Sequence, residues 1–250
     1  MLNLAIIVPC YNEQEVLPLT ARRLREKLIA LEKLGLIATT SKVVFVDDGS
    51  RDATWDLIEG FFKKDPACFG GVKLAKNRGH QNALLCGLLT MKDAFDAIVS
   101  LDADLQDDIN AIDEMIRKHL DGFEIVFGVR SERKTDSSFK RITAHGYYTL
   151  LKFLGVDIVY DHADFRLMGK KSLGALDEYT EVNLFLRGMM PQLGFRTATV
   201  AYKREARTAG ESKYPLLKML KLAFEGITSF STRPIKMITC LGISIFAVSI

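Results

Sequence analysis

Short apolar runs alternate with amphipathic stretches through the first half of the chain. The apolar runs predict strands at 4–8, 42–46, 71–74, 97–99 and 124–129, and the stretches between them predict helices at 13–33, 54–64, 82–92 and 110–120. In the first of these helices, Val16, Leu24, Leu28 and Leu31 hold apolar positions. Strands that alternate with helices favour an α/β fold, with a mostly parallel, Rossmann-like sheet and helices on both of its faces.

The alternation weakens after Arg130. Residues 131–140 are polar and predict a loop, 142–154 predict a helix, and 164–168 and 197–202 predict two further short strands. No repeat, low-complexity tract or Pro/Gly-rich linker interrupts this part of the chain. We therefore expect one globular domain over residues 1–205.

The C-terminal segment follows a different pattern. Apolar Leu217, Leu220, Phe224 and Ile227 repeat at helical spacing within 214–230, so segment 206–234 predicts a basic loop and an amphipathic helix lying in a membrane interface. Residues 237–250 contain no charged side chain. Because spanning a bilayer takes ~20 residues, we interpret 235–250 as the N-terminal part of a truncated transmembrane segment. An ordinary surface helix at 214–230 and a buried core helix at the C-terminus remain the alternatives.

Composition and charge narrow the classes of function. The 48% hydrophobic and 26% charged content is typical of a globular protein, and a net charge of +3 does not indicate a nucleic-acid partner. The basic residues crowd toward the C-terminal end, which indicates contact with phosphate or with a membrane surface. They are Arg204, Arg207, Lys213, Lys218, Lys221, Arg233 and Lys236.

Cysteine usage and the N-terminus bear on the cellular compartment. Cys10, Cys68, Cys86 and Cys240 are widely scattered and include no CxxC pair, which favours free thiols over disulfides or a zinc site. The apolar run at 4–8 is too short for a signal peptide. A reducing, cytosolic compartment fits both observations.

The segment Ser100–Gln106 carries the most informative chemistry. Asp102 and Asp104 follow an apolar run, and residues spaced i, i+2 in a strand point to the same side, so both carboxylates can reach one cation. Ligands tend to bind at the carboxyl ends of parallel strands, and Mg²⁺ takes oxygen ligands and commonly bridges to phosphate. The pattern predicts a metal-diphosphate site. Taken alone, the pair would favour a solvated turn at a strand end, and it is the motifs around it that favour the metal site.

Three other motifs are expected at the same edge of the sheet. Residues 9–13 follow the first strand, 46–50 close the second and 76–79 follow the third. They bring an aromatic residue, carboxylates and a basic segment beside the predicted metal pair, a set that suits a nucleotide diphosphate. Each motif alone is also compatible with a turn or a helix cap.

Together these motifs resemble the inverting, family-two glycosyltransferases with a GT-A fold. The resemblance is closest to bacterial polyprenyl-phosphate glycosyltransferases, the bactoprenol glucosyltransferase group, and more distant to dolichol-phosphate mannose synthases. It covers nearly the whole chain. The motifs are VPCYNE at 8–13, VDDGS at 46–50, NRGHQ at 77–81, DADLQ at 102–106, DFRL at 164–167 and RTAGESKY at 207–214.

The resemblance implies roles for individual residues. Pro9, Tyr11, Glu13, Asp48, Lys76 and Asp102 would bind the nucleotide. Asp102, Asp104 and Gln106 would ligate Mg²⁺ or Mn²⁺. The catalytic set would be Asp164, Arg130, Arg141, Arg207 and Lys213. The four basic residues of this set would lie around phosphates. An acceptor phosphate is already anionic near neutral pH and needs no strong base, which favours an orienting role for Asp164 over the alternative role of a base.

The activity implied is inverting transfer of a sugar from a nucleotide sugar to a polyprenyl phosphate. UDP-glucose or a UDP-N-acetylhexosamine is the expected donor, and residues 1–205 would be the GT-A catalytic domain. Lys- and Arg-rich residues precede the apolar C-terminal run, so the positive-inside bias places this domain at the cytoplasmic face of the cell membrane. A homo-oligomer is compatible with the sequence.

Two other enzyme classes conflict with the sequence. A processive polysaccharide synthase needs a QxxRW motif, whereas the only tryptophan is Trp55. A dinucleotide-binding oxidoreductase needs glycines after the first strand, and 9–13 has none. A catalytically silent, membrane-attached scaffold with a nucleotide-binding domain remains the alternative. His80 and His162 lie beside motifs without neighbouring partners in the sequence, which favours structural roles.

Overall fold

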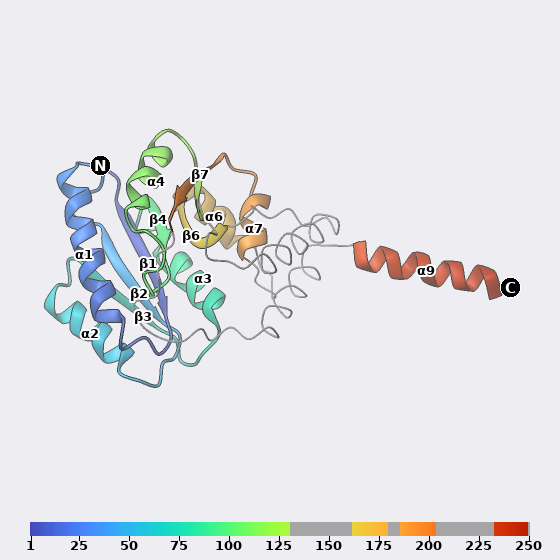
Figure 1. Cartoon of the computed structure of the whole chain (residues 1–250), viewed down its shortest axis with the longest axis horizontal. Helices are drawn as coiled ribbons and strands as arrows, with labels where there is room; N and C mark the ends of the chain where they lie inside the picture. Colours follow the sequence, from blue (N-terminus) through green and yellow to red (C-terminus); the bar gives the residue numbers. More distant parts are fainter. Residues whose placement is uncertain (131–161, 180–185, 204–232, 250) are drawn as a thin grey trace. The chain divides into compact units, whose positions relative to one another are not determined.

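The computed structural model describes residues 1–130, 162–179, 186–203 and 233–249 (Figure 1). The chain divides into two compact units. One carries the whole described sheet with its helices, and the other carries the described helices α7 (Leu186–Gln192) and α9 (Arg233–Ser249). Every predicted site residue that the structure describes belongs to the first unit.

The strands and helices of the first unit confirm most of the expected alternation. Its strands are β1 (Leu4–Cys10), β2 (Lys42–Asp47), β3 (Phe69–Lys73), β4 (Ala97–Ser100), β5 (Ile125–Arg130), β6 (His162–Gly169) and β7 (Thr197–Tyr202). Its helices are α1 (Leu17–Lys33), α2 (Thr54–Lys64), α3 (His80–Met91), α4 (Ala111–Leu120) and α6 (Lys170–Asp177).

The sheet is mostly parallel, as the sequence predicts. Its seven strands lie in the order β3-β2-β1-β4-β6-β5-β7. Strands β1 to β4 pair in parallel, and β5 pairs in parallel with β7. The exception is β6, which inserts antiparallel between β4 and β5. This insertion brings the 164–167 motif next to the end of β4.

Helices cover both faces of the sheet. α1, α2 and α4 share one face, while α3 and α6 lie on the other (Figure 1). Alternate side chains of β1 divide between these layers: Leu4, Ile6 and Val8 enter the core that α1 and α4 cover. Ile7 points to the opposite face, where a Cβ placed on Gly87 of α3 would lie 2.6 Å from its Cγ2. The absence of a side chain at Gly87 therefore lets α3 pack closely on the sheet.

Two element boundaries differ from the sequence prediction near the N-terminus. The helix expected at 13–33 begins at Leu17, because the amides of Val16 and Leu17 donate to the carbonyl of Glu13 in a preceding turn and Pro18 occupies the first helical turn. Strand β1 also continues through Pro9. The Ile7 carbonyl faces β4, where it accepts a hydrogen bond from Leu101 N, and the nitrogen of Pro9 faces the same side. The pairing with β4 ends at Ile7, so no hydrogen bond between the strands is lost because Pro9 has no N–H.

The acidic pair lies outside the strand to which the prediction assigned it. β4 ends at Ser100, and residues 101–110 form turns and irregular backbone. The argument from strand alternation therefore does not apply to Asp102 and Asp104. Their neighbours Leu101, Ala103 and Leu105 are nevertheless buried, whereas the two carboxylates are only part-buried.

The C-terminal helix α9 carries an exposed apolar surface. Ile238, Ile243, Ile245, Phe246 and Val248 are all more than 60% exposed. Within the described ranges, no helix combines the length and apolarity needed to cross a bilayer. The loop predicted at 131–140 and the helices predicted at 142–154 and 214–230 lie outside the described residues.

Candidate functional site

The predicted motifs after β1 to β4 gather at one edge of the sheet. Because these strands are parallel and adjacent, their carboxyl ends lie side by side: Cys10 pairs with Asp47, Asp47 with Lys73, and Ile7 with Ser100. The segments that follow each strand therefore meet. This juxtaposition confirms the edge expected from the sequence.

Asp48 fastens the third of these segments to the second. Its Oδ1 accepts a hydrogen bond from the amide of Arg78 at 2.7 Å, and its Oδ2 accepts from the amide of Gly79 at 2.9 Å. The residue is 2% exposed. Backbone donors thus bind both oxygens of a buried carboxylate, which fixes the position of segment 76–79 and its predicted nucleotide ligand, the exposed Lys76.

Gly49 allows the same two segments to touch. Its φ of +68° is strained for residues with a side chain, and a Cβ there would lie 2.6 Å from both Asn77 N and Lys76 C. The obstacle is backbone, which cannot move aside as a flexible side chain would. This glycine is required for both turning and close approach.

Side-chain to backbone hydrogen bonds join the first segment to the second. The amide of Asn12 donates to Ser50 Oγ, and the amide of Glu13 donates to Thr54 Oγ1, each at 2.9 Å. Asn12, with a φ of 53°, also accepts from the amide of Arg51. Tyr11, which precedes Asn12 in the first segment, is 39% exposed, so part of its ring is accessible for a planar base to stack on.

Helix α1 and local hydrogen bonds hold the DADLQ segment. Thr20, fully buried on α1, donates to the carbonyl of Ala103 at 2.8 Å. Asp104 Oδ1 accepts from the amide of Gln106 at 3.2 Å across Leu105, whose φ is 52°. One hydrogen bond therefore attaches the segment to α1, and another closes a turn within the segment.

A second acidic residue reaches this segment through the antiparallel strand β6. Ser100 pairs with Arg166, and the Ser100 hydroxyl donates to the carbonyl of Asp164. His80 Nε2 lies 3.5 Å from Asp102 Oδ1 and 3.4 Å from Asp164 Oδ2, and so bridges the two carboxylates. Asp164 is 5% exposed, and its Oδ1 accepts from Arg166 Nη2 at 3.1 Å.

The electrostatics of this cluster favour a bound cation. Desolvation by the surrounding protein raises the pKa of Asp102, His80 lowers it, and the carboxylates of Asp164, Asp107 and Asp104 raise it further. Mutually repelling carboxylates are stabilised by positive charge. The carboxylate and amide oxygens of Asp102, Asp104 and Gln106 are of the kind that Mg²⁺ and Mn²⁺ prefer, so the donor chemistry fits such an ion. No group of three or more His, Cys, Asp or Glu side chains in the described part of the chain is arranged to hold a metal.

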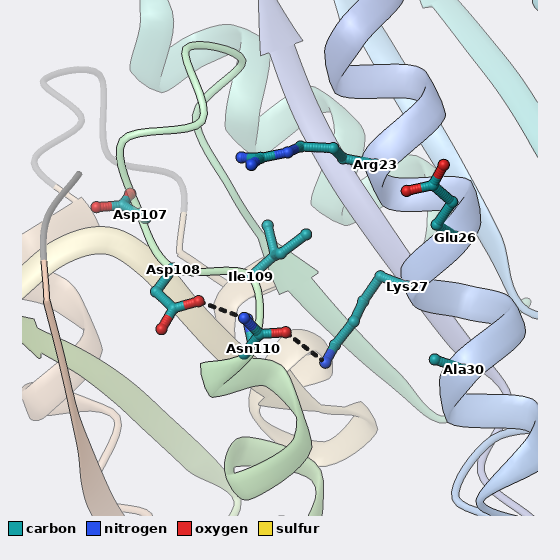
Figure 2. A pocket seen from close by; sticks show the side chains of 8 residues that line it. All are labelled: Arg23, Glu26, Lys27, Ala30, Asp107, Asp108, Ile109 and Asn110. Atoms are coloured by element: carbon teal, nitrogen blue, oxygen red, sulfur yellow. Dashed lines mark hydrogen bonds between the residues drawn. The ribbon is translucent and has the colours of Figure 1, made fainter. Parts of the chain in front are cut away.

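A cavity of about 280 Å³ is lined by residues 107–110, which directly follow the DADLQ segment, and by four residues of α1. Figure 2 shows it between α1 and residues 107–110, with Arg23 reaching toward the loop and Lys27 bonded to Asn110 at 3.3 Å. None of the residues that line it belongs to the predicted nucleotide or metal sets. Its lining carries two basic and three acidic side chains, so its charges offset one another.

The structure brings most of the predicted site residues together, but not all are described. Pro9, Tyr11, Glu13, Asp48, Lys76, Asp102, Asp104 and Gln106 lie on the four edge segments, with Asp164 on β6 and Arg130 at the end of β5. Arg141, Arg207 and Lys213 lie outside the described residues.

Sequence reasoning did not find the contacts of His80, Asp107 and Tyr202. His80 contacts two acidic residues that stand 22 and 84 positions away in the chain. Tyr202 donates to Asp107 Oδ1 at 2.5 Å across 95 positions. Only the sheet order brings these groups together, so no local signal in the sequence could reveal them.

Comparison with known proteins agrees with the geometry. Residues 5–176 match the family model described as glycosyl transferase family 2. The Bacillus subtilis (strain 168) protein YkoT, an uncharacterized glycosyltransferase, is 52% identical over 248 residues, which are 98% of this chain and 73% of the relative. The bactoprenol glucosyl transferase of Shigella phage SfX is 34% identical over 249 residues, which are 99% of this chain and 79% of the relative.

A solved structure supports the fold assignment. Glucosyl-3-phosphoglycerate synthase from Mycobacterium tuberculosis, in complex with Mn²⁺, UDP-glucose and phosphoglyceric acid, matches with a TM-score of 0.52 at 15% identity. The match covers 90% of this chain and 77% of that chain. At this identity the likeness concerns the fold: a mostly parallel, mixed α/β sheet of the GT-A type.

Proposed function

The chain belongs to glycosyl transferase family 2, and we propose that it moves a sugar from a nucleotide sugar to a polyprenyl phosphate at the cytoplasmic face of the cell membrane. UDP-glucose or a UDP-N-acetylhexosamine is the proposed donor. The likeness over 99% of this chain to a protein named bactoprenol glucosyl transferase supports a lipid acceptor. The structural match that was crystallised with UDP-glucose supports a nucleotide donor.

One observation carries this proposal most directly. The segments after four parallel strands meet at one edge, and β6 adds Asp164 beside Asp102 through their shared neighbour His80. In the proposed arrangement a nucleoside would lie beside the exposed ring of Tyr11 and the segments that Asp48 joins, and its diphosphate would extend toward the DADLQ carboxylates.

The divalent cation is part of the proposal. Asp102, Asp104 and Gln106 would hold Mg²⁺ or Mn²⁺, and when bound the ion supplies positive charge that stabilises the leaving nucleoside diphosphate. The pKa of Asp102 is raised, first by desolvation and then by the neighbouring carboxylates of Asp164, Asp107 and Asp104, and the repulsion among these carboxylates supports this role.

The chemistry itself is a displacement with inversion. An acceptor phosphate oxygen attacks the anomeric carbon and forms the new C–O bond, while the bond to the donor diphosphate breaks on the opposite side. The attacking phosphate is already anionic, so no proton has to be removed. Arg166 contacts one oxygen of Asp164 and His80 lies near the other, which supports an orienting role for this carboxylate. Basic side chains would bind the phosphates: Arg130, Arg141, Arg207 and Lys213.

The membrane arrangement is proposed from the sequence. The catalytic domain, residues 1–205, would be cytoplasmic, segment 206–234 would lie along the inner leaflet, and 235–250 would begin a membrane segment. Arg233 and Lys236 precede the uncharged run, as the positive-inside bias requires. Bound in this way, the basic loop would stand at the depth of a lipid phosphate.

A nucleotide-release assay distinguishes this enzyme from a silent scaffold. The protein is incubated with a panel of UDP- and GDP-sugars, with Mn²⁺ or with EDTA, in detergent that contains undecaprenyl phosphate. We expect release of nucleoside diphosphate that depends on one donor, on the metal and on the lipid. A scaffold would bind nucleotide without releasing diphosphate under any of these conditions.

A further inference from the structure

Arg130, a predicted phosphate ligand, occupies a well-defined place in the sheet. It is the last residue of β5, and it pairs with Tyr202, the last residue of β7. Because β5 runs parallel to β4, Arg130 emerges at the same carboxyl edge as the DADLQ segment. Its side chain is 28% exposed, so it borders solvent at this edge.

Tyr202 and Asp107 hold one side of the Arg130 guanidinium. The Tyr202 hydroxyl donates to Asp107 Oδ1 at 2.5 Å and accepts from Arg130 Nε at 3.4 Å. Asp107 Oδ1 also lies 3.6 Å from Arg130 Nη2. In the described part of the chain, Arg130 makes these contacts with its Nε and Nη2 atoms. A guanidinium carries five N–H donors in a planar fork, so these contacts fix the orientation of the whole group.

The holding pair is itself buried and closely packed. Tyr202 is 3% exposed, and its ring meets Phe165 edge-on with centroids 5.3 Å apart and an interplanar angle of 84°. A Cβ on Gly128 would lie 3.0 Å from the Tyr202 ring and 2.7 Å from Phe165, so the backbone of β5 closes the other side. Asp107 is also 3% exposed and directly follows Gln106. A buried carboxylate needs a charged or hydrogen-bonding partner, and Tyr202 and Arg130 provide both.

We propose that Asp107 and Tyr202 are positioning residues that aim the Arg130 guanidinium at a phosphate group at the carboxyl edge of the sheet. The pair links the DADLQ segment to β5, β6 and β7, so the predicted metal ligands and the arginine keep a fixed separation. This inference rests on the proposed function in one respect, namely that the ligand contains phosphate. That phosphate belongs either to the nucleotide donor or to the lipid acceptor.

Binding measurements on the full chain test the proposal without requiring turnover. The affinity for UDP with Mn²⁺, and separately for a short-chain polyprenyl phosphate in micelles, is measured by calorimetry for Tyr202→Phe, Arg130→Ala and the double variant. Tyr202→Phe removes only the hydroxyl and keeps the ring on Phe165. Loss of a hydrogen bond that orients a charged group should lower the affinity for one of the two ligands about tenfold. The arm that weakens identifies which phosphate Arg130 binds.

The double variant separates positioning from a structural role. If Tyr202 acts through Arg130, Tyr202→Phe has no further effect in the Arg130→Ala background, because the group that it positions is gone. Tyr179→Phe, at an exposed tyrosine outside the network, serves as the matched control and should bind both ligands as the parent does. Should Tyr202→Phe not fold, Asp107→Asn gives the same test.

The outcomes are distinct. Equal loss of affinity in both backgrounds, unchanged affinity for both ligands, or a parent protein that binds neither ligand would each overturn the positioning role. A parent that binds UDP in an Arg130-dependent way but transfers no sugar would refute the proposed function and leave this inference standing.

Discussion

Asp104 and Asp48 are both acidic residues at the carboxyl edge of the sheet, yet their surroundings differ. Asp104 is part-buried, and Gln106 N donates to its Oδ1 within the same turn. Asp48 is 2% exposed, and two backbone amides of another segment donate to its oxygens. The Asp104 carboxylate is thus bonded within its own turn, whereas the Asp48 carboxylate joins two segments of the chain.

We predict that Asp104→Asn sharply reduces catalysis without unfolding the protein. Removal of a charged ligand should weaken metal-dependent donor binding and transfer at least about a hundredfold, since even groups that only support metal ligands contribute up to that factor. Thermal unfolding should stay near that of the parent. Asp108→Asn, four residues further on, is the control and should keep activity. Normal turnover with unchanged metal dependence in Asp104→Asn would refute the metal assignment.

Asp48→Ala should affect both stability and binding. Two backbone amides, those of Arg78 and Gly79, lose the buried charged acceptor that both bind, which should lower the free energy of unfolding by about 3 kcal/mol. Because segment 76–79 also carries Lys76, affinity for UDP should fall in the same variant. Urea denaturation and calorimetry measure the two effects. A variant as stable as the parent would show that the loop does not depend on this carboxylate.

At the scale of elements, the contact between the segments after β2 and β3 depends on Gly49. Gly49→Ala should destabilise the protein by on the order of 3 kcal/mol, because the left-handed φ and a 2.6 Å contact with backbone add together. Nucleotide binding should also fall. Gly35→Ala is a matched control, since Gly35 has a φ of +66° and nothing within 4 Å of its Cβ position, so only the conformational cost of about 1 kcal/mol remains. Equal effects of the two substitutions would contradict the close approach.

The order of elements could be predicted because each strand and helix has its own local pattern. Continuous apolar residues predict β1, β2 and β4, and the helical pattern at 54–64 predicts both ends of α2. The parallel pairing of the strands then places four motifs at one edge. The start of α1 was misplaced because the residues after Glu13 have helical spacing but fold as a turn before Pro18.

Pairings between distant residues could not be predicted. Nothing in the sequence of 162–169 says that β6 lies antiparallel between β4 and β5, and the contact of Asp164 with His80 follows from that placement. Tyr202 likewise meets Asp107 only because β7 joins the sheet next to β5. The motifs therefore predict which segments meet at the edge, but they do not predict the contacts that His80, Asp107 and Tyr202 make there.

For the whole molecule, attachment to the membrane remains a prediction from the sequence. Replacing Leu217, Leu220, Phe224 and Ile227 with polar residues should lower membrane association and lipid-acceptor activity together, because they form the apolar side of the predicted interfacial helix. Flotation with vesicles and a transfer assay measure the two effects. Nucleotide binding should survive, since it needs only the catalytic domain. Its loss in step with lipid activity would assign this helix to the core instead.

The central claim, that this chain joins a sugar to a polyprenyl phosphate, is tested most directly by the mass of the lipid. Undecaprenyl phosphate is incubated with the protein, Mn²⁺ and each nucleotide sugar in turn, and the extracted lipid is analysed by mass spectrometry. The proposal predicts a lipid heavier by one sugar residue, formed with a preferred donor, absent with EDTA and absent with Asp104→Asn. An unmodified lipid with every donor, from protein that is folded and binds UDP, would contradict it.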